Sequence, residues 1–401
     1  MRPRLASLLI TVLCLTIAPT ATADTITIAP GQSIQAAINL LLINSSPIDT
    51  VLLSPGTYAQ SAVVDFSGTN QTGMTIARKQ SSRPIILGGI LVRDAFRVTL
   101  SGLRVDSPHG DQTAAIVVRD SSAIAVDKCS GFPGDDGGLD VEDTFEMVVL
   151  QSDFSGMEVT SGEGGYGLKI IGGCAHFLSN VEAAANEREG IFIQADESEL
   201  RDVVATGGEA GGMLIDGLRN VLKSCTAKSN GGVGIAIEGV ADLKSCTVAA
   251  NDGVGVRFGE DGGSTEHGGV LKGSTIKNNG GNGVLVREEH RGLIVKGNKL
   301  TANKGAGVRL IGDGNHVTDN SIKETKSGSN GGHGVLIESA SRRNCIDQNT
   351  VKENAGTGVR VEGDDNYVLA NVGKSGDGFV DAGGSGNSGR ANTTSGNNDF
   401  P

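Results

Sequence analysis

A short alternation of apolar and polar positions, introduced by glycine, recurs along most of the chain. It is seen in NGGVGIAIEG at 230–239, in NGGNGVLVRE at 279–288 and in NAGTGVRVEG at 354–363. Alternation with a period of two places one set of side chains on each face of a β-strand. Each unit therefore predicts a short strand with an apolar inner face, and the glycine before it is expected to permit a sharp turn of the backbone.

The units repeat at a nearly regular interval. The residues that open them lie 20 to 29 positions apart, most often near 22, and are Ala115, Gly138, Gly167, Gly190, Gly212, Gly234, Gly255, Gly283, Gly307, Gly334, Gly358 and Gly378. A repeat of this length, with occasional longer intervals, indicates a solenoid whose insertions fall in its loops.

A second strand follows at a fixed offset, as in NVLKSCT, LIVKGNKL and NYVLANV. Aligning these segments places small or amide side chains in one column: Cys225, Cys246, Ser274, Asn298, Asn320, Asn349 and Asn371. We expect the stacked asparagines to bond each other and the backbone at an inward turn. Because no helix separates the strands, each must pair with its counterpart in the next coil, about 4.8 Å away. The pattern predicts a parallel β-helix.

The repeat resembles the right-handed parallel β-helix of the pectin-lyase-like superfamily, over about residues 25–400. The segment DTVLLSPGTY at 49–58 is similar to an early strand and turn of that superfamily. Ser33, before IQAAI, is placed to be the N-cap of a short helix that covers the open end of the solenoid. The resemblance implies an all-β fold, a right-handed parallel β-helix of about 22-residue coils with a short N-terminal capping helix.

The N-terminus reads as a secretory signal. Arg2 and Arg4 precede an apolar run, and Ala21-Thr22-Ala23 is a small-residue cleavage site. We therefore expect a signal peptide over 1–23 and a secreted protein, periplasmic or extracellular. The mature chain has no second apolar run of about 18 residues, so no membrane span is predicted. The expected domain is a single β-helix over 24–401, with an N-terminal cap and early coils at 24–114, regular coils at 115–381 and a C-terminal cap at 382–401.

Charge narrows the class of partner. The chain has 34 Lys and Arg against 46 Asp and Glu, and loss of the signal leaves 32 against 46, a net charge of −14. Such a surface repels nucleic acid and anionic membranes. It also argues against unaided capture of an acidic polysaccharide, unless a divalent cation bridges carboxylate to carboxylate. A polysaccharide partner is what the resemblance to the pectin-lyase-like superfamily implies. Five cysteines remain after the signal, widely spaced, and do not form a disulfide framework.

Candidate chemistry gathers in the early coils. FPGDDGGLDVED at 132–143 contains Asp135, Asp136 and Asp140, the next coil adds Tyr166 and Lys169, and the preceding loop adds His109. Carboxylates, a tyrosine and a histidine suit acid–base work on a sugar, and a lysine can stabilise developing negative charge. Alternatively, Asp135, Asp136 and Asp140 hold a calcium ion, or the turn is structural and its side chains cap their own backbone.

A further resemblance assigns roles. GDDGGLDV is similar in outline to the N-T-D-G-x-D strand of polygalacturonase-type hydrolases, which implies that Asp136 and Asp140 protonate the leaving group and activate water. The G-H-G coil of that family falls on Gly165-Tyr166-Gly167, without histidine. The D-P-H-D strand of the alginate epimerases falls on Asp140-Val141-Glu142, without proline or histidine.

Other positions on the outward face suggest simpler roles. Phe192, Leu214 and Ala236 would form an apolar patch that stacks a sugar ring or is covered by a loop. The arginines and glutamates of later coils, such as Arg360 with Glu362 and Glu338, predict exposed ion pairs. His267, His290 and His316 are scattered, without the spacing of metal ligands.

Two functions remain open at this point. In the first, the protein acts on a polysaccharide, chiefly a polyuronate, as a lyase, hydrolase or C5-epimerase. In the second, it is a non-catalytic extracellular β-helix that binds glycans or has a structural role at a surface, because this fold hosts both kinds of protein.

Overall fold

The structure is a computed structural model that describes residues 23–44, 48–69, 71–106, 114–131, 137–157, 165–259, 266–326, 332–375 and 377–400. The expected signal peptide, except for its last residue, lies outside the described residues, as do His109, Asp135 and Asp136. Among the described helices, none is long and apolar enough to cross a membrane.

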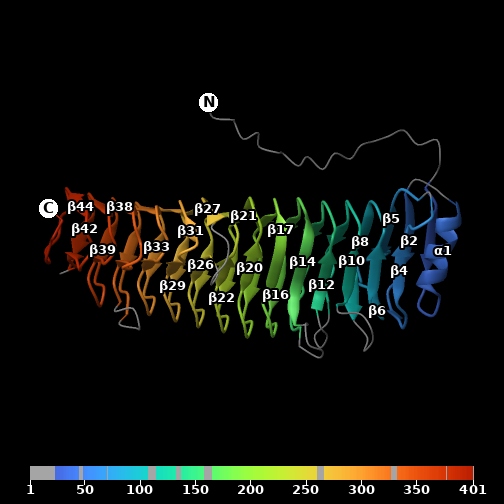
Figure 1. Ribbon diagram of the computed structural model, residues 1–401. Coiled ribbons are helices and arrows are strands. Elements are labelled where there is room, and N and C mark those ends of the chain that lie inside the picture. Colours follow the sequence, from blue (N-terminus) through green and yellow to red (C-terminus); the bar gives the residue numbers. More distant parts are fainter. Residues whose placement is uncertain are drawn as a thin grey trace.

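The chain winds into an elongated parallel β-helix, with its first coils at one end and its last at the other (Figure 1). The longest sheet of the described residues has 16 strands in the order β1 (Thr25–Ile28), β2 (Asp49–Leu53), β5 (Met74–Arg78), β8 (Val98–Ser101), β11 (Ala125–Asp127), β13 (Val148–Leu150), β15 (Phe177–Ser179), β18 (Glu199–Arg201), β21 (Asn220–Lys223), β24 (Ala241–Lys244), β28 (Val270–Lys272), β32 (Ile294–Lys296), β35 (His316–Thr318), β38 (Cys345–Asp347), β41 (Tyr367–Leu369) and β44 (Ser388–Arg390).

A second sheet contains the glycine-led strands of the repeat. Its 14 strands are β4 (Ala62–Asp65), β7 (Ile90–Arg93), β10 (Ile116–Arg119), β12 (Gly137–Glu142), β14 (Tyr166–Cys174), β17 (Ile191–Asp196), β20 (Met213–Asp216), β23 (Ile235–Ile237), β26 (Val256–Phe258), β30 (Val284–Val286), β34 (Val308–Leu310), β37 (Val335–Ile337), β40 (Val359–Val361) and β43 (Phe379–Asp381).

The third wall of the solenoid is shorter. Its nine-stranded sheet contains β16 (Glu182–Ala184), β19 (Val204–Thr206), β22 (Thr226–Lys228), β25 (Thr247–Ala249), β29 (Thr275–Lys277), β33 (Lys299–Thr301), β36 (Ser321–Lys323), β39 (Thr350–Lys352) and β42 (Val372–Lys374). Smaller sheets are formed by β3 (Thr57–Tyr58), β6 (Ile85–Leu87) and β9 (Arg104–Asp106), and by β27 (Glu266–His267) with β31 (His290–Arg291). Every pairing is parallel, with strands one coil apart, as the repeat predicts.

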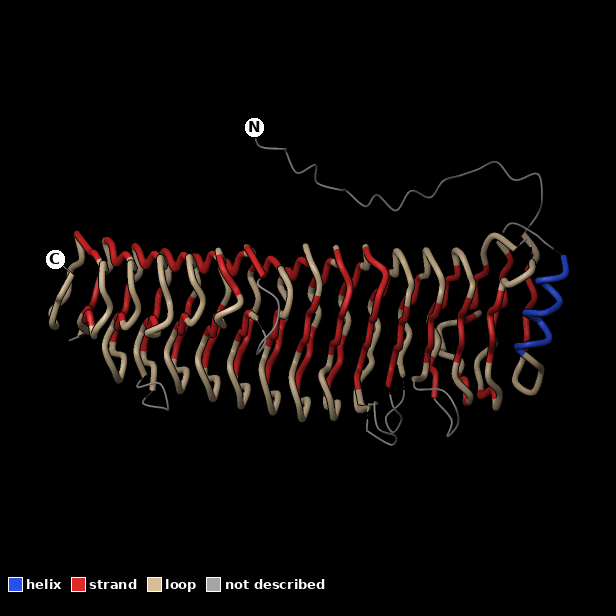
Figure 2. Tube along the Cα trace, in the orientation of Figure 1, coloured by secondary structure: helices blue, strands red, loops and turns tan. Residues whose placement is uncertain are grey.

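The helix α1 (Ile34–Asn44) covers the first coil (Figure 2). The hydroxyl of Ser33 accepts a 3.0 Å hydrogen bond from the amide of Ala36, which is the N-cap bond expected from the sequence. Ile34, Ile38 and Leu41 are buried against the core. The helix thus protects the open edge of the 16-stranded sheet and its apolar interior from water, which confirms the predicted cap.

The aligned column of small and amide side chains forms a ladder, as predicted. The Oδ1 atom of Asn320 accepts hydrogen bonds from the backbone amide (2.9 Å) and the Nδ2 (3.0 Å) of Asn298, and Asn320 donates from Nδ2 to Asn349 at 3.0 Å. Cys225 and Cys246 lie in the same column. All five cysteines of the described residues have free thiols. A second buried ladder, not predicted from the sequence, joins Asn230, Asn251, Asn279 and Asn303.

The glycines that open the strands have a different role from the one expected. Gly234 does not have a positive φ; instead, a Cβ atom there would lie 2.7 Å from the carbonyl oxygen of Gly255 in the next coil and 2.5 Å from Cγ1 of Val248. The same crowding recurs at Gly212 and Gly283. The glycine column is therefore needed because adjacent coils approach closely at this corner, not because the backbone turns sharply there.

Candidate functional site

The 14-stranded sheet carries one column of side chains along its outer face. Register pairs place Asp140, Lys169, Phe192, Leu214, Ala236, Arg257, Leu285, Arg309, Leu336 and Arg360 side by side, one per coil. Positions far apart in sequence thus become neighbours at the strand spacing of about 4.8 Å.

Asp140 and Lys169 bring opposite charges together on this face. They are register partners on β12 and β14, and Val117 precedes Asp140 in the column. Asp140 is only 4% exposed, whereas Lys169 is half-buried. A carboxylate with so little contact with water depends on neighbouring polar groups. On the same strand, Glu142 pairs with Arg119 at 3.3 Å.

Tyr166 lies at the start of β14, beside Phe192. The two ring centroids are 5.4 Å apart, and the planes are tilted by 52°. Arg188 donates a 2.9 Å hydrogen bond from Nη1 to the Tyr166 hydroxyl, and its guanidinium carbon lies 5.2 Å from the centre of the ring. Three contacts made by two residues of the next coil, Arg188 and Phe192, therefore fix the tyrosine.

Sequence reasoning did not find Arg188. The residue belongs to NEREG, the turn before Gly190, where later coils have uncharged segments such as NGGVG. The charged residues in this turn, where the repeat usually has none, are the sequence feature that could have identified Arg188. The backbone amide of Arg188 also bonds the carbonyl of Gly165, 3.0 Å away, which ties this turn to the coil of Tyr166.

A hollow adjoins the cluster along the same column. It has a volume of about 280 Å³, and its lining includes Leu214, Ala236, Glu189, Glu238 and Arg257. Leu214 follows Phe192 in register, so the hollow begins one coil from the aromatic pair. The predicted apolar patch is present, although Ala236 is only 5% exposed and forms the floor rather than an open surface.

The later coils carry the predicted ion pairs. Arg257 pairs with Glu238 at 2.5 Å, and Arg360 with Glu362 at 2.7 Å. Glu338 pairs with Arg309 at 2.8 Å rather than with Arg360. These pairs are partly exposed, so each contributes at most about 1 kcal/mol to stability.

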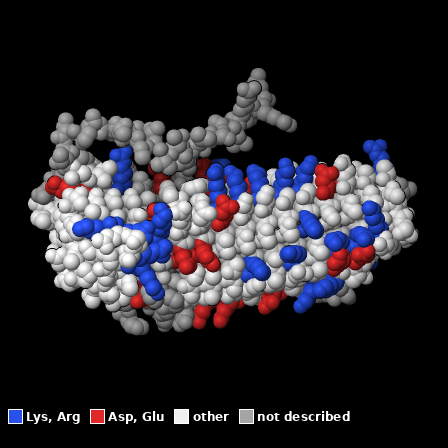
Figure 3. Space-filling model, turned by 180° about the vertical axis from the view of Figure 1, so that it is seen from behind, with Lys and Arg blue, Asp and Glu red and all other residues white. Residues whose placement is uncertain are grey.

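Positive charge is concentrated in rows despite the net charge of −12. Along the 16-stranded sheet, register places Arg201, Lys223, Lys244, Lys272 and Lys296 in one column. Lines of Lys and Arg side chains are visible on the rear face of the molecule (Figure 3). Glu199 pairs with both Arg201 and Lys223. An acidic polymer that approaches the protein therefore meets positive rows as well as acidic surface.

The predicted calcium site cannot be built from the described residues alone, because two of its three ligands, Asp135 and Asp136, lie outside them. Within the described part of the chain, Asp140 belongs to no group of three or more side chains that could share one metal ion.

A parallel β-helix with a charged and aromatic cluster on one outer face defines the class of this protein. The right handed beta helix region family matches the chain over residues 88–265, 137–322 and 244–372, which together extend from 88 to 372. The chain therefore belongs to the right-handed β-helix family. A sequence search among curated proteins gives no match.

Several solved structures share the fold. The A-module of mannuronan C-5 epimerase AlgE6 from Azotobacter vinelandii is 18% identical, with a TM-score of 0.54 over 90% of this chain and 94% of that one. The tailspike protein 3 of bacteriophage CBA120 is 9% identical, with a TM-score of 0.59 over 80% of this chain and 55% of that one. The catalytic domain of a GH87 α-1,3-glucanase is 11% identical, with a TM-score of 0.53 over 82% and 68%.

Proposed function

We propose that the protein binds an acidic polysaccharide on the outer face of the 14-stranded sheet and acts on one uronate unit there. The observation that carries the proposal is the register pairing of Asp140 with Lys169, next to Tyr166 and Phe192. An acid, a base and a cation within one or two coils of each other match the chemistry that a uronate requires.

That chemistry begins with the proton at C5, next to the sugar carboxylate. Removing this proton places negative charge on the carboxylate, and Lys169 is placed to stabilise that charge. Asp140 and Tyr166 are the described groups that can take or return a proton. If the proton returns on the other face of the ring, the sugar is epimerised. If the bond from C4 to the glycosidic oxygen breaks instead, the oxygen takes up a proton and a C4=C5 double bond remains.

The hollow beside the cluster extends the site along the column. Its volume of about 280 Å³ lies near the lower end of small-molecule pockets, so it accommodates a short stretch of a longer polymer. The epimerases with this fold are named for mannuronan, a polyuronate, and the GH87 enzyme for a glucan. These names support a polysaccharide, and the lysine and arginine residues at the site favour an acidic one. We further propose that the protein works outside the cytoplasm, because residues 1–23 have the pattern of a secretory signal.

The test is a panel of uronate polymers, with and without calcium, incubated with wild-type protein, Lys169→Met and Arg360→Gln. Arg360 lies in the same column far from the cluster and serves as the matched control. We expect Lys169→Met to abolish turnover and Arg360→Gln to retain it. Ultraviolet absorbance reports unsaturated ends, a reducing-sugar assay reports hydrolysis, and NMR reports epimer content. Binding without any of the three products would assign the protein to the non-catalytic class. The absence of both binding and turnover on every polymer would overturn the proposal.

A further inference from the structure

Three side chains on the outer face of the 16-stranded sheet lie close enough to share one ion. They are His316 on β35, and Cys345 and Asp347 on β38. His316 and Cys345 are register partners in consecutive coils. Nε2 of His316 lies 2.6 Å from Oδ1 of Asp347, and one donor atom from each residue lies within 4.8 Å of the others.

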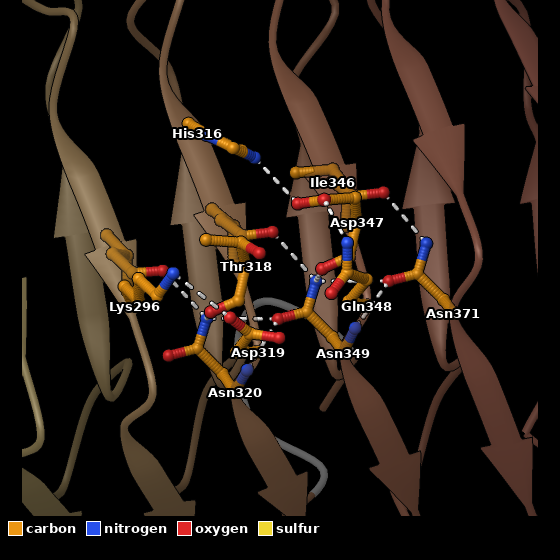
Figure 4. A network of polar contacts seen from close by, with 12 residues as sticks. Lys296, His316, Thr318, Asp319, Asn320, Ile346, Asp347, Gln348, Asn349 and Asn371 are labelled. Carbon is orange, nitrogen blue, oxygen red and sulfur yellow. Dashed lines mark hydrogen bonds and ion pairs between the residues drawn. The ribbon is translucent and has the colours of Figure 1, made fainter.

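The fold fixes this arrangement. Residues two apart on a strand point to the same face, so Cys345 and Asp347 are both directed outward, and the parallel register places His316 beside them. Two residues of the asparagine ladder follow these strands by two positions. Asn349 donates to the Asp347 carbonyl, and Asn320 to that of Thr318, each at 2.9 Å. Figure 4 shows the imidazole directed toward the carboxylate, with the ladder beneath. Hydrogen bonds from the ladder asparagines therefore fix the backbone of the two strands that carry the three side chains.

The carboxylate has an outer partner as well. Gln348 donates from Nε2 to Oδ2 of Asp347 at 3.2 Å, while Oδ1 is directed to His316. Such second contacts orient a ligating carboxylate and are typical of metal sites. The Asp347 side chain is 16% exposed and that of His316 41%, so the group is partly screened from water and still accessible.

We infer that His316, Cys345 and Asp347 form a binding site for a divalent transition-metal cation of the zinc class. One imidazole, one thiolate and one carboxylate together match zinc, whereas calcium and magnesium require mostly oxygen ligands. Three protein ligands leave the fourth tetrahedral position open to solvent. The distance between Nε2 and Oδ1 must widen to about 3.3 Å to admit an ion with bonds of 2.0–2.1 Å. The His316 and Asp347 side chains are partly exposed, which leaves room for the small rotations that this requires.

The site links two coils. An ion that binds the folded chain stabilises it according to its free concentration relative to Kd. At 100 times Kd the effect is about 2.7 kcal/mol. This inference does not depend on the proposed action on polysaccharide, because the 14-stranded sheet contributes none of the three residues.

Zinc binding is tested on the full chain after treatment with a chelator. Isothermal titration with zinc chloride is expected to give one equivalent, with at least a 100-fold weaker Kd in Cys345→Ser and in His316→Gln. Cys174→Ser changes another partly buried free thiol and is the matched control, with affinity unchanged. Cobalt(II) gives an independent reading, since ligation by sulfur produces a charge-transfer band in the near ultraviolet.

The cobalt band is expected in the wild type and in Cys174→Ser, and its loss in Cys345→Ser assigns the sulfur ligand. Circular dichroism of the metal-free variants checks that each one folds. Asp347→Asn removes the carboxylate ligand with almost no change in side-chain shape, so it is expected to weaken zinc binding without affecting folding. The inference is overturned if zinc fails to bind, if the folded variants bind as well as the wild type, or if the band persists without Cys345.

Discussion

Arg188 holds the hydroxyl of Tyr166 through a 2.9 Å hydrogen bond, while Phe192 holds its ring at a centroid distance of 5.4 Å. The hydroxyl and the ring of this tyrosine can therefore be tested separately. Tyr166→Phe keeps the aromatic contact and removes the group that transfers a proton. On a polymer that the protein turns over, we expect kcat to fall about 100-fold, within the range for general acid–base groups, and KM to change little. Steady-state kinetics measure both, and an unchanged kcat would exclude Tyr166 from the reaction.

Gly234 is predicted to be intolerant of a side chain. Gly234→Ala places a Cβ atom against the carbonyl of Gly255 and the ladder amide of Asn251, so we expect a loss of about 2–3 kcal/mol, as for other overpacked cores. Gly297→Ser is the control, because nothing lies within 4 Å of an added Cβ there. The φ of Gly297 is 63°. At the same turn of other coils, Ser224 and Ser245 have similar values of 54° and 57°, so a serine is accommodated in this conformation. Urea unfolding compares the two, and equal losses would show that crowding is not the cause.

The asparagine ladder should contribute more to stability than its exposed neighbours. Asn320→Ala removes the acceptor for the amide of Asn298 and the donor to the carbonyl of Val295, both buried. Each buried polar group left without its partner costs about 1–3 kcal/mol, so we expect the free energy of unfolding to fall by about 3 kcal/mol. Ser321→Ala, at the next and exposed position, should change it by less than about 0.5 kcal/mol. Denaturant titration of both variants measures the difference.

The side chain of Asp377 is buried, and its carboxylate accepts a 3.2 Å hydrogen bond from the backbone amide of Asn354. Burial raises the pKa of the Asp377 carboxyl above its ordinary value of 3.8. The folded chain thus retains this proton to higher pH than the unfolded chain, and stability falls as pH rises from that value through the folded pKa. Asp377→Asn is expected to stabilise the protein at neutral pH, because it removes a negative charge that burial disfavours while keeping an acceptor oxygen for the Asn354 amide.

The gain from Asp377→Asn should shrink as the pH falls toward 4, where the wild-type carboxyl becomes neutral as well. Thermal unfolding of the wild type and the variant at a series of pH values measures this difference in stability. Asp365→Asn, at an exposed turn, controls for the loss of one negative charge. A gain that stays constant with pH would show that ionisation of the buried carboxyl is not responsible.

Much of the fold could be predicted because one repeat determines it. Once the glycine-led units are aligned, Asp140, Lys169 and Phe192 must occupy one column, and in the structure they are register partners in consecutive coils. The role of the glycines could not be predicted in the same way. The crowding at Gly234 arises from the next coil, and the sequence does not give the distance between coils at that corner.

For the candidate sites as well, residues within the repeat could be predicted, whereas residues whose positions depend on contacts between coils could not. Arg188 comes from a turn, whose path depends on contacts rather than on the strand period. Along the chain His316 has no metal-ligand spacing to another histidine, because the other two residues of its cluster, Cys345 and Asp347, lie one coil away. The aligned segments NHVTDNSI and NCIDQNTV already place His316 and Cys345 in the same column. Comparing polar residues down the columns of a solenoid would have found the cluster.

The parallel register of the strands also determines how the protein responds to a mechanical force that pulls on its two ends. The hydrogen bonds between coils run along the long axis, so tension applied to the two ends acts on the coils in series. Terminal coils have a neighbour on one side only, and they should peel away first. Each released coil, such as 213–234, would lengthen the chain by about 75 Å. Extension under force would then proceed one coil at a time, with step lengths that follow the lengths of the coils and with the last coils yielding before the end that α1 covers.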